Sequence, residues 1–125
     1  MKIIILGLAL IALVGCRHMF HKETFVTVGL VNMSDKKLVG TKLSAADRQL
    51  FSAGLMSPNA ESTHLDYSWS NMPDQAKLSF LDYETRKSYS IEVSLTDVNA
   101  HVLSGKCKQV TIRILDYDKA EVACK

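Results

Sequence analysis

Residues 89–95 read YSIEVSL and carry the clearest period-two pattern in the chain. Apolar side chains alternate with polar ones at every position, with Tyr89, Ile91, Val93 and Leu95 on one side and Ser90, Glu92 and Ser94 on the other. Residues two apart lie on the same face of a strand. The apolar face must pack against a second sheet, because an isolated hairpin is marginally stable in water. The stretch therefore predicts a half-buried strand in a two-layer fold.

Shorter stretches of the same kind lie on both sides of it. The further predicted strands cover residues 24–32, 37–43, 63–67, 76–81, 110–114 and 120–124. About seven short strands separated by turn residues predict an all-β sandwich of immunoglobulin-like kind, with a small open barrel as the alternative. A three-residue turn at residues 116–118 would pair Ile114 with Ala120, Ile112 with Val122 and Val110 with Cys124.

One short helix is expected in this domain. Ser44 is followed three residues later by Asp47, which resembles a capping box, and Gly54 offers a stop, so the helix should run from Ser44 through Phe51. Residues 96–105 are expected to form a loop.

The N-terminus is typical of an export signal. Lys2 precedes an apolar run from Ile3 to Val14, which as a helix would be about 18 Å long, short of the roughly 30 Å needed to cross a bilayer. Leu13-Val14-Gly15-Cys16 resembles the lipobox of bacterial lipoprotein precursors. The resemblance implies a cleaved signal peptide (residues 1–15), acylation of Cys16, a lipidated tether (16–23) and a periplasmic domain (24–125). The alternative is an ordinary secretory signal with a coincidental Cys16.

The residue after Cys16 and the net charge of the mature chain indicate the location of the protein and its class of partner. Arg17 follows Cys16, and by the family's sorting habit the lack of Asp there implies the outer membrane, facing the periplasm. Removal of residues 1–15, whose only charged residue is Lys2, lowers the formal net charge from +2 to +1. So weak a charge argues against nucleic acid as a partner. The pairs Lys36-Lys37 and Arg86-Lys87 are expected in solvated turns.

Cys107 and Cys124 remain once Cys16 is acylated, and an exported domain can form disulfides. A bridge between them would close a loop of about 17 residues and stabilise the fold by roughly 3 kcal/mol. The register above puts Cys124 opposite Val110 rather than Cys107. The alternative is therefore two free thiols, one of them buried.

Catalytic, metal and cofactor motifs are not found. The chain has no Gly-x-Ser-x-Gly, His-Glu-x-x-His, phosphate loop or Cys-x-x-Cys, so we expect neither an enzyme nor a bound metal or cofactor. His18 and His21 lack a third ligand nearby, and surface positions are expected for His64 and His101. Turn and strand-edge roles are expected for three acids, Asp66, Asp82 and Glu84.

Two loops are candidates for partner binding. One contains Tyr67, Trp69 and Met72 among small polar residues, and the other contains Leu55 and Met56. Aromatic side chains dominate binding hot spots, so the two loops would form a partner-binding edge if they lay at one end of the sandwich. Alternatively, Trp69 plugs the end of the core.

The mature chain also resembles, weakly, small proteobacterial lipoproteins whose genes accompany type VI secretion lipase effectors, some of which act as immunity proteins. The similar stretches are Gly29-Leu30-Val31-Asn32, Ala76-Lys77-Leu78-Ser79-Phe80 and the closing hairpin. The resemblance implies capture of a secreted toxin without catalysis. We therefore expect a membrane-anchored, non-catalytic protein-binding module. The alternative is a structural or assembly lipoprotein of an envelope complex, such as a secretion-system accessory or a surface-exclusion factor.

Overall fold

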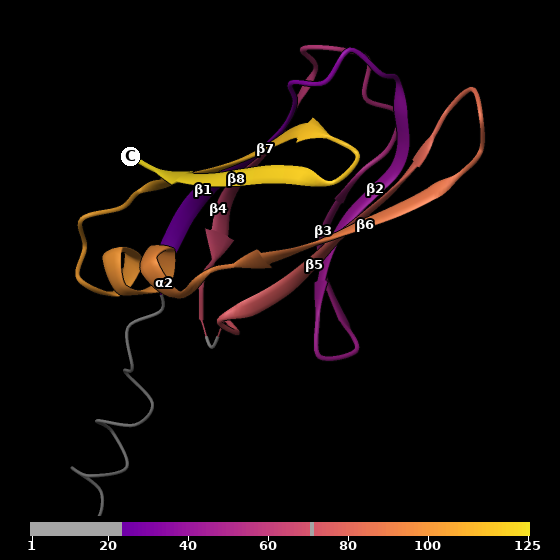
Figure 1. The fold of residues 1–125 in the computed structure, drawn as a ribbon. Helices are drawn as coiled ribbons and strands as arrows, with labels where there is room; N and C mark the ends of the chain where they lie inside the picture. Colours follow the sequence, from indigo (N-terminus) through magenta and orange to yellow (C-terminus); the bar gives the residue numbers. More distant parts are fainter. Residues whose placement is uncertain (1–23, 71) are drawn as a thin grey trace, which may run out of the picture.

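The computed structural model describes residues 24–70 and 72–125, and within them the chain forms eight strands and one helix (Figure 1). The predicted signal peptide, the tether with Cys16, His18 and His21 lie outside these residues. The elements are β1 (Phe25–Asn32), β2 (Leu38–Ala45), β3 (Arg48–Ala53), β4 (Glu61–Ser68), β5 (Gln75–Asp82), β6 (Ser88–Ser94), α2 (Thr96–Leu103), β7 (Gln109–Asp116) and β8 (Lys119–Cys124).

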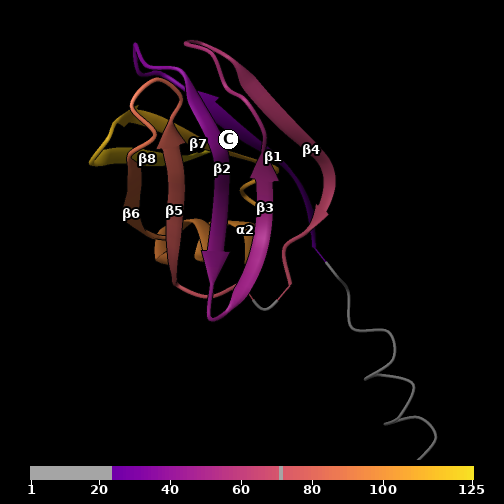
Figure 2. The ribbon, with the colours of Figure 1, turned by 90° about the vertical axis from the view of Figure 1, so that its right-hand side faces the viewer.

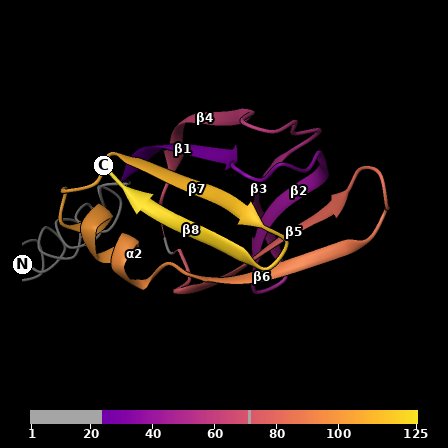
Figure 3. The same ribbon diagram turned by 45° about the horizontal axis from the view of Figure 1, so that its top comes forward.

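The strands form two four-stranded sheets. The first has the order β4-β1-β7-β8, in which β1 runs parallel to β7, and the second has the order β3-β2-β5-β6. Figure 3 shows the strands of the first sheet lying side by side in that order. The predicted all-β sandwich is confirmed, with eight strands in place of about seven and two separate sheets in place of a barrel.

The core lies between the sheets and follows the predicted alternation. Val28, Leu30 and Ile112 point inward from the first sheet, and Leu78 and Ile91 from the second. Burial of each such side chain contributes about 1.5–3 kcal/mol. The prediction that the apolar face of residues 89–95 packs against another sheet is therefore confirmed.

The helix predicted from Ser44 to Phe51 is wrong: the segment is a β-hairpin. β2 and β3 pair with Ala45 opposite Arg48, and the two residues between them, Ala46 and Asp47, have φ angles of 47° and 64°. Two positive φ angles in a two-residue loop are the signature of a type I′ hairpin turn. Leu43 and Phe51 face each other across this hairpin and are buried in the core. Their burial outweighs the local capping signal.

The helix lies instead where a loop was expected. α2 buries Val98, Asn99 and Val102 and has no side-chain cap at its N-terminus. Val98 and Val102 are one helical turn apart, so they face the core together. This helix has little sequence signal, because its buried face is short and includes the polar Asn99.

The closing hairpin has the predicted register. Val110 pairs with Cys124, Ile112 with Val122 and Ile114 with Ala120. Cys107 and Cys124 form the predicted disulfide, with their Cα atoms 5.5 Å apart, a usual separation for such a bridge. It ties the segment before β7 to the last strand.

All strands run between the same two ends of the sandwich. We call one end the base: it holds the start of β1, the β2–β3 turn, residues 69–74, α2 and residues 104–108. The other end is the apex, formed by residues 33–37, 54–60, 83–87 and 117–118. In Figure 2 the apical loops lie at the top, and β1 starts at the lower right. No helix in the described part of the chain is long and apolar enough to span a membrane.

Candidate functional site

The residues predicted to bind a partner do not share one surface. Trp69 and Met56 are both buried in the core, Tyr67 and Met72 are half-buried, and Leu55 is exposed. The two candidate loops also lie at opposite ends of the molecule, because β4 runs from the apex to the base between them. The predicted edge that joins the two loops is therefore wrong.

Trp69 plugs the base of the core, as the alternative interpretation had it. Its Nε1 donates a hydrogen bond to Asn99 Oδ1 on α2, at 2.8 Å. Asn99 Nδ2 in turn donates to the carbonyl oxygens of Met72 and Pro73 and to Asp74 Oδ1, at 3.1–3.3 Å. The buried indole and amide are thus satisfied. These hydrogen bonds fix α2 to the loop between β4 and β5. The Trp69 N–H is already bonded to Asn99, so it does not bind a partner.

Three of the six exposed large apolar side chains in the described residues lie at the apex. Leu55 is 54% exposed, Met33 is 49% exposed and Tyr83 is 39% exposed, and they come from three different apical loops. The predicted role of Leu55 is thus compatible with its position. Met33 and Tyr83 were not singled out in the sequence, because each is an isolated apolar residue beside a turn.

The buried Asn32 at the end of β1 holds the apical loops together. Its Nδ2 donates to the carbonyl oxygens of Lys36 (2.7 Å) and Met56 (2.9 Å), and its Oδ1 accepts from the backbone N–H and the hydroxyl of Ser34. The third loop joins through the N–H of Tyr83, which donates to the carbonyl of Lys37 at 2.9 Å. Residues distant in sequence are thereby placed on one surface.

Two cations flank the ring of Tyr83. Lys37 Nζ lies 4.5 Å from the ring centroid and Arg86 Cζ lies 5.0 Å from it. Cation–π contacts of this kind contribute about 0.5–1 kcal/mol at exposed sites and orient the ring. Tyr, Arg and Met are enriched at protein interfaces. We call Met33, Leu55, Tyr83, Lys37 and Arg86 the apical surface.

Asp82 supports this surface from below and links the two sheets. Its Oδ1 accepts from the N–H groups of Glu84 (2.8 Å) and Thr85 (3.0 Å), and its Oδ2 accepts from the hydroxyl of Tyr117. These hydrogen bonds, chiefly that from Tyr117, lower the pKa of Asp82 below 3.8. The predicted turn role of Asp82 is confirmed, since the carboxylate is buried and already bonded.

Tyr117 belongs to an aromatic stack at the edge where the sheets meet. Its ring lies 4.1 Å from that of Tyr89, which lies 5.9 Å from that of Phe80. The hydrogen bond to Asp82, with burial, raises the pKa of Tyr117 to about 12. The contact holds the β7–β8 turn of one sheet against the end of β5 in the other.

The Tyr117–Asp82 bond predicts a specific loss of stability at high pH. The folded protein keeps the Tyr117 proton up to about pH 12, whereas the unfolded chain releases it near pH 10. The Tyr117–Asp82 hydrogen bond therefore stabilises the fold fully below about pH 10, and this stabilisation is lost as the pH rises toward 12. Conversely, the stabilisation from Asp82 is lost as the pH falls below 3.8. Tyr117→Phe should reduce the alkaline loss, measured by denaturant unfolding across this range, while the share of Tyr67, whose pKa burial also raises, remains. An unchanged profile would contradict the assignment, and Tyr83→Phe is the matched control.

His64 is not on the surface as predicted. It pairs with the buried Val28, its ring lies 5.6 Å from that of Phe51, and its buried Nε2 has no hydrogen-bond partner among the described residues. A register shift between Val26 and Val28 changes the phase of β4, so that Leu65 points outward instead. His101 is exposed as predicted, but it lies on α2 rather than in a loop. Asp66 lies in the edge strand β4 and Glu84 in the turn between β5 and β6, as predicted.

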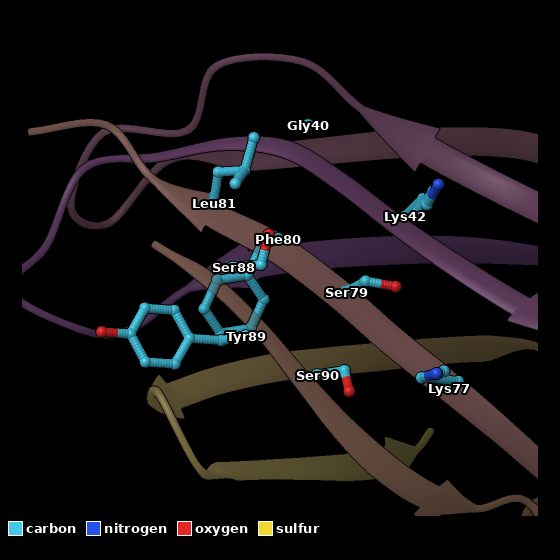
Figure 4. A pocket seen from close by; sticks show the side chains of 9 residues that line it. All are labelled: Gly40, Lys42, Lys77, Ser79, Phe80, Leu81, Ser88, Tyr89 and Ser90. Atoms are coloured by element: carbon cyan, nitrogen blue, oxygen red, sulfur yellow. The ribbon is translucent and has the colours of Figure 1, made fainter. Parts of the chain in front are cut away.

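A hollow of about 380 Å³ lies on the outer face of the second sheet (Figure 4). Lys42, Ser79 and Ser90 are cross-strand neighbours there, and Lys77 lies beside them. The hollow exists because the serines are short. Its lining contains serines and lysines but no His, Cys, Asp or Glu. In residues 24–70 and 72–125, no three potential ligands gather as a metal site requires.

Comparisons of the chain with protein-family models, curated proteins and solved structures return no match. The interpretation of the apical surface therefore depends on the geometry described above.

Proposed function

We propose that the protein is a bacterial lipoprotein, anchored through Cys16 to the outer membrane and facing the periplasm, that binds a protein partner through the apical surface without catalysis. The observation that carries the proposal is the exposure of Met33, Leu55 and Tyr83 on one end of the sandwich, with Lys37 and Arg86 beside them. This composition and this exposure are typical of an interface.

The position of the apex suits a tethered binder. The described chain starts at the base, and the eight residues of β1 then span about 26 Å toward the apex. An anchor that precedes the base therefore leaves the apical surface directed away from the membrane. Confinement to a membrane also raises the effective concentration of the protein near partners there.

The chemistry of the apical surface limits the partner. Three apolar side chains call for an apolar recess on the partner, and the cations of Lys37 and Arg86 favour carboxylates around that recess. The resemblance to immunity-type lipoproteins makes a secreted toxin the partner class we propose.

Capture from periplasmic extract on the acylated wild-type protein tests the apical surface. A double variant, Leu55→Ala with Tyr83→Ala, is expected to weaken binding of the specific partner by about 2 kcal/mol or more, roughly 30-fold in Kd. A double variant, Lys77→Ala with Glu92→Ala, is the matched control, because both side chains are exposed and the two residues pair across β5 and β6, away from the apex. Equal retention of the partner by the apical variant would reject the surface.

The identity of the captured partner tests the toxin proposal. Expressed in the periplasm, the partner should be toxic, and the wild-type protein but not the apical variant should rescue the cells. Capture of a multi-subunit envelope assembly, with no toxicity, would instead support the assembly role.

The anchor has a separate test. Cys16→Ser removes the thiol that accepts the lipid, so the variant precursor should lose acylation and membrane association, as measured by mass spectrometry and fractionation. Because the acyl chains supply about 0.8 kcal/mol for each buried methylene, no other part of the chain should replace them. A variant that is processed and retained as the wild type is would refute the anchor.

A further inference from the structure

The base of the sandwich carries its own exposed apolar side chains. Leu65 and Leu103 are each 75% exposed and Phe25 is 54% exposed, which makes the two leucines the most exposed large apolar residues in the described chain. Leu103 and Phe25 lie at the base itself, and Leu65 lies in the middle of β4. Single exposed apolar side chains are ordinary, but several toward one end of a small domain indicate a surface that contacts something apolar.

These three side chains lie on the side of the first sheet. Phe25 pairs with Ser68, and Leu65 lies in β4 where the register of β1 shifts, so both are close to the start of β1. Leu103 ends α2, which packs against β8 of the same sheet. Figure 1 shows α2 at the same end of the molecule as the start of β1, and β4 and β8 are the two edge strands of this sheet.

Three lysines accompany them. Lys106, Lys108 and Lys125 are all exposed at this end. The N–H of Thr27 donates to the carbonyl of Lys108, and the N–H of Lys108 donates to that of Lys125, so backbone hydrogen bonds place Lys108 beside β1 and Lys125 next to Lys108.

Acidic residues of the base lie apart from the segments that carry these lysines. Asp97 lies in α2, Asp74 accepts a hydrogen bond from Asn99 of that helix, and Asp66 lies in β4. Residues 104–109 and 122–125, which carry the three lysines, contain no Asp or Glu. This part of the base is therefore positively charged.

The tether limits what can face this surface. Residues 17–23 lie between Cys16 and the described chain, and these seven residues span at most about 25 Å when fully extended. If Cys16 is acylated, the base must stay close to the bilayer. The tether adds Arg17 and Lys22 against Glu23. The membrane is therefore the surface within reach of the base that is both apolar and anionic.

We propose that the base is a membrane-docking surface, in which Phe25, Leu65 and Leu103 enter the interface of an anionic bilayer and Lys106, Lys108 and Lys125 contact lipid phosphates. The proposal rests on the lipid anchor proposed above. Basic residues near anionic lipids and apolar side chains at the headgroup boundary act together in such docking. Docking would hold the axis from base to apex roughly perpendicular to the membrane and present the apical surface to the periplasm.

Quenching of tryptophan fluorescence by brominated lipids tests the docking. Leu103→Trp and Leu55→Trp are made in the full acylated protein, at the base and the apex respectively, and both are reconstituted on vesicles of phosphatidylcholine with phosphatidylglycerol. The wild type, whose only tryptophan is the buried Trp69, supplies the background. We expect several-fold stronger quenching at position 103 than at position 55. Replacement of Lys106, Lys108 and Lys125 by Gln, or vesicles of phosphatidylcholine alone, should reduce that difference.

The outcomes separate the docking from the anchor. If the proteins float with vesicles and both positions are quenched equally, the base does not dock, while the anchor stands. If the difference persists without the lysines and without phosphatidylglycerol, the proposed recognition of anionic lipid is wrong. If no variant floats, the anchor is absent and the docking proposal fails with it.

Discussion

Trp69→Ala is expected to lower the free energy of unfolding by about 3–5 kcal/mol, the range observed for removal of a large aromatic side chain from a core. Trp69 is buried to 2% exposure, and it contacts the ring of Tyr67 edge-on at 6.3 Å between centroids. The substitution empties the base of the core and leaves Asn99 Oδ1 without its donor. Domains of this size have about 5–15 kcal/mol of stability in total, so much of the fold's stability depends on this one side chain.

Trp69→Phe separates the contribution of ring packing from that of the hydrogen bond to Asn99. It keeps most of the ring and removes only the Nε1–H bond to Asn99, so its cost should be near the 1–3 kcal/mol of an unsatisfied buried acceptor. Unfolding by urea should be followed by circular dichroism, because Trp69 is the only tryptophan and both variants lack its fluorescence. If the alanine variant costs no more than the phenylalanine variant, Trp69 is not a core residue and its burial in the structure is wrong.

The sequence predicted the parts of the fold that depend on simple alternation. Residues 89–95 and the hairpin of β7 and β8 keep a strict period of two, and their faces and register are as expected. A slip by one residue would turn every apolar side chain of such a strand to water, so the pattern determines the register.

The errors occur where distant contacts override local preference. The segment from Ser44 to Phe51 has a capping pattern, but Phe51 packs against Tyr67 and His64 of the other sheet, which requires a strand. In β4 the register shift places His64 inward and Leu65 outward, and nothing near them in the sequence indicates this. Helix propensity and alternation are weak where tertiary packing decides.

The candidate site was predicted less well than the fold. Trp69 has the composition of both a hot spot and a core plug, and only its burial separates the two. The apical surface combines Met33, Leu55 and Tyr83 from turns that are far apart in the sequence. The position of Leu55 relative to Met33 depends on Asn32. Three of the hydrogen bonds of the Asn32 side chain are local, to Ser34 and Lys36, but the bond to the Met56 carbonyl joins a loop 24 residues away, and nothing near Asn32 in the sequence indicates it.

Asn32→Asp should therefore destabilise the apex and the whole fold by about 2–4 kcal/mol, since two buried carbonyls lose their donor. The change preserves the shape of the side chain but places an oxygen against the carbonyls of Lys36 and Met56, where Nδ2 had donated. An ionised carboxylate there would be buried without a cation, and a protonated one could donate to only one of the two carbonyls. Hydrogen exchange should accelerate first in residues 33–37 and 54–60, and denaturant unfolding should give the loss in stability.

Asn59→Asp is the matched control, because Asn59 lies in the same loop as Met56 but its side chain is exposed, and Asp tolerates the positive φ of 68° there. It adds the same charge to the apex without entering the Asn32 network, so it should change stability by less than about 0.5 kcal/mol. If both variants lose the same stability, the added charge rather than the lost donors is responsible. If neither does, the apical loops are held by something other than Asn32. A loss at Asn32 alone, accompanied by weaker capture of the partner, would connect the buried amide to the exposed surface through the positions of Met33 and Leu55.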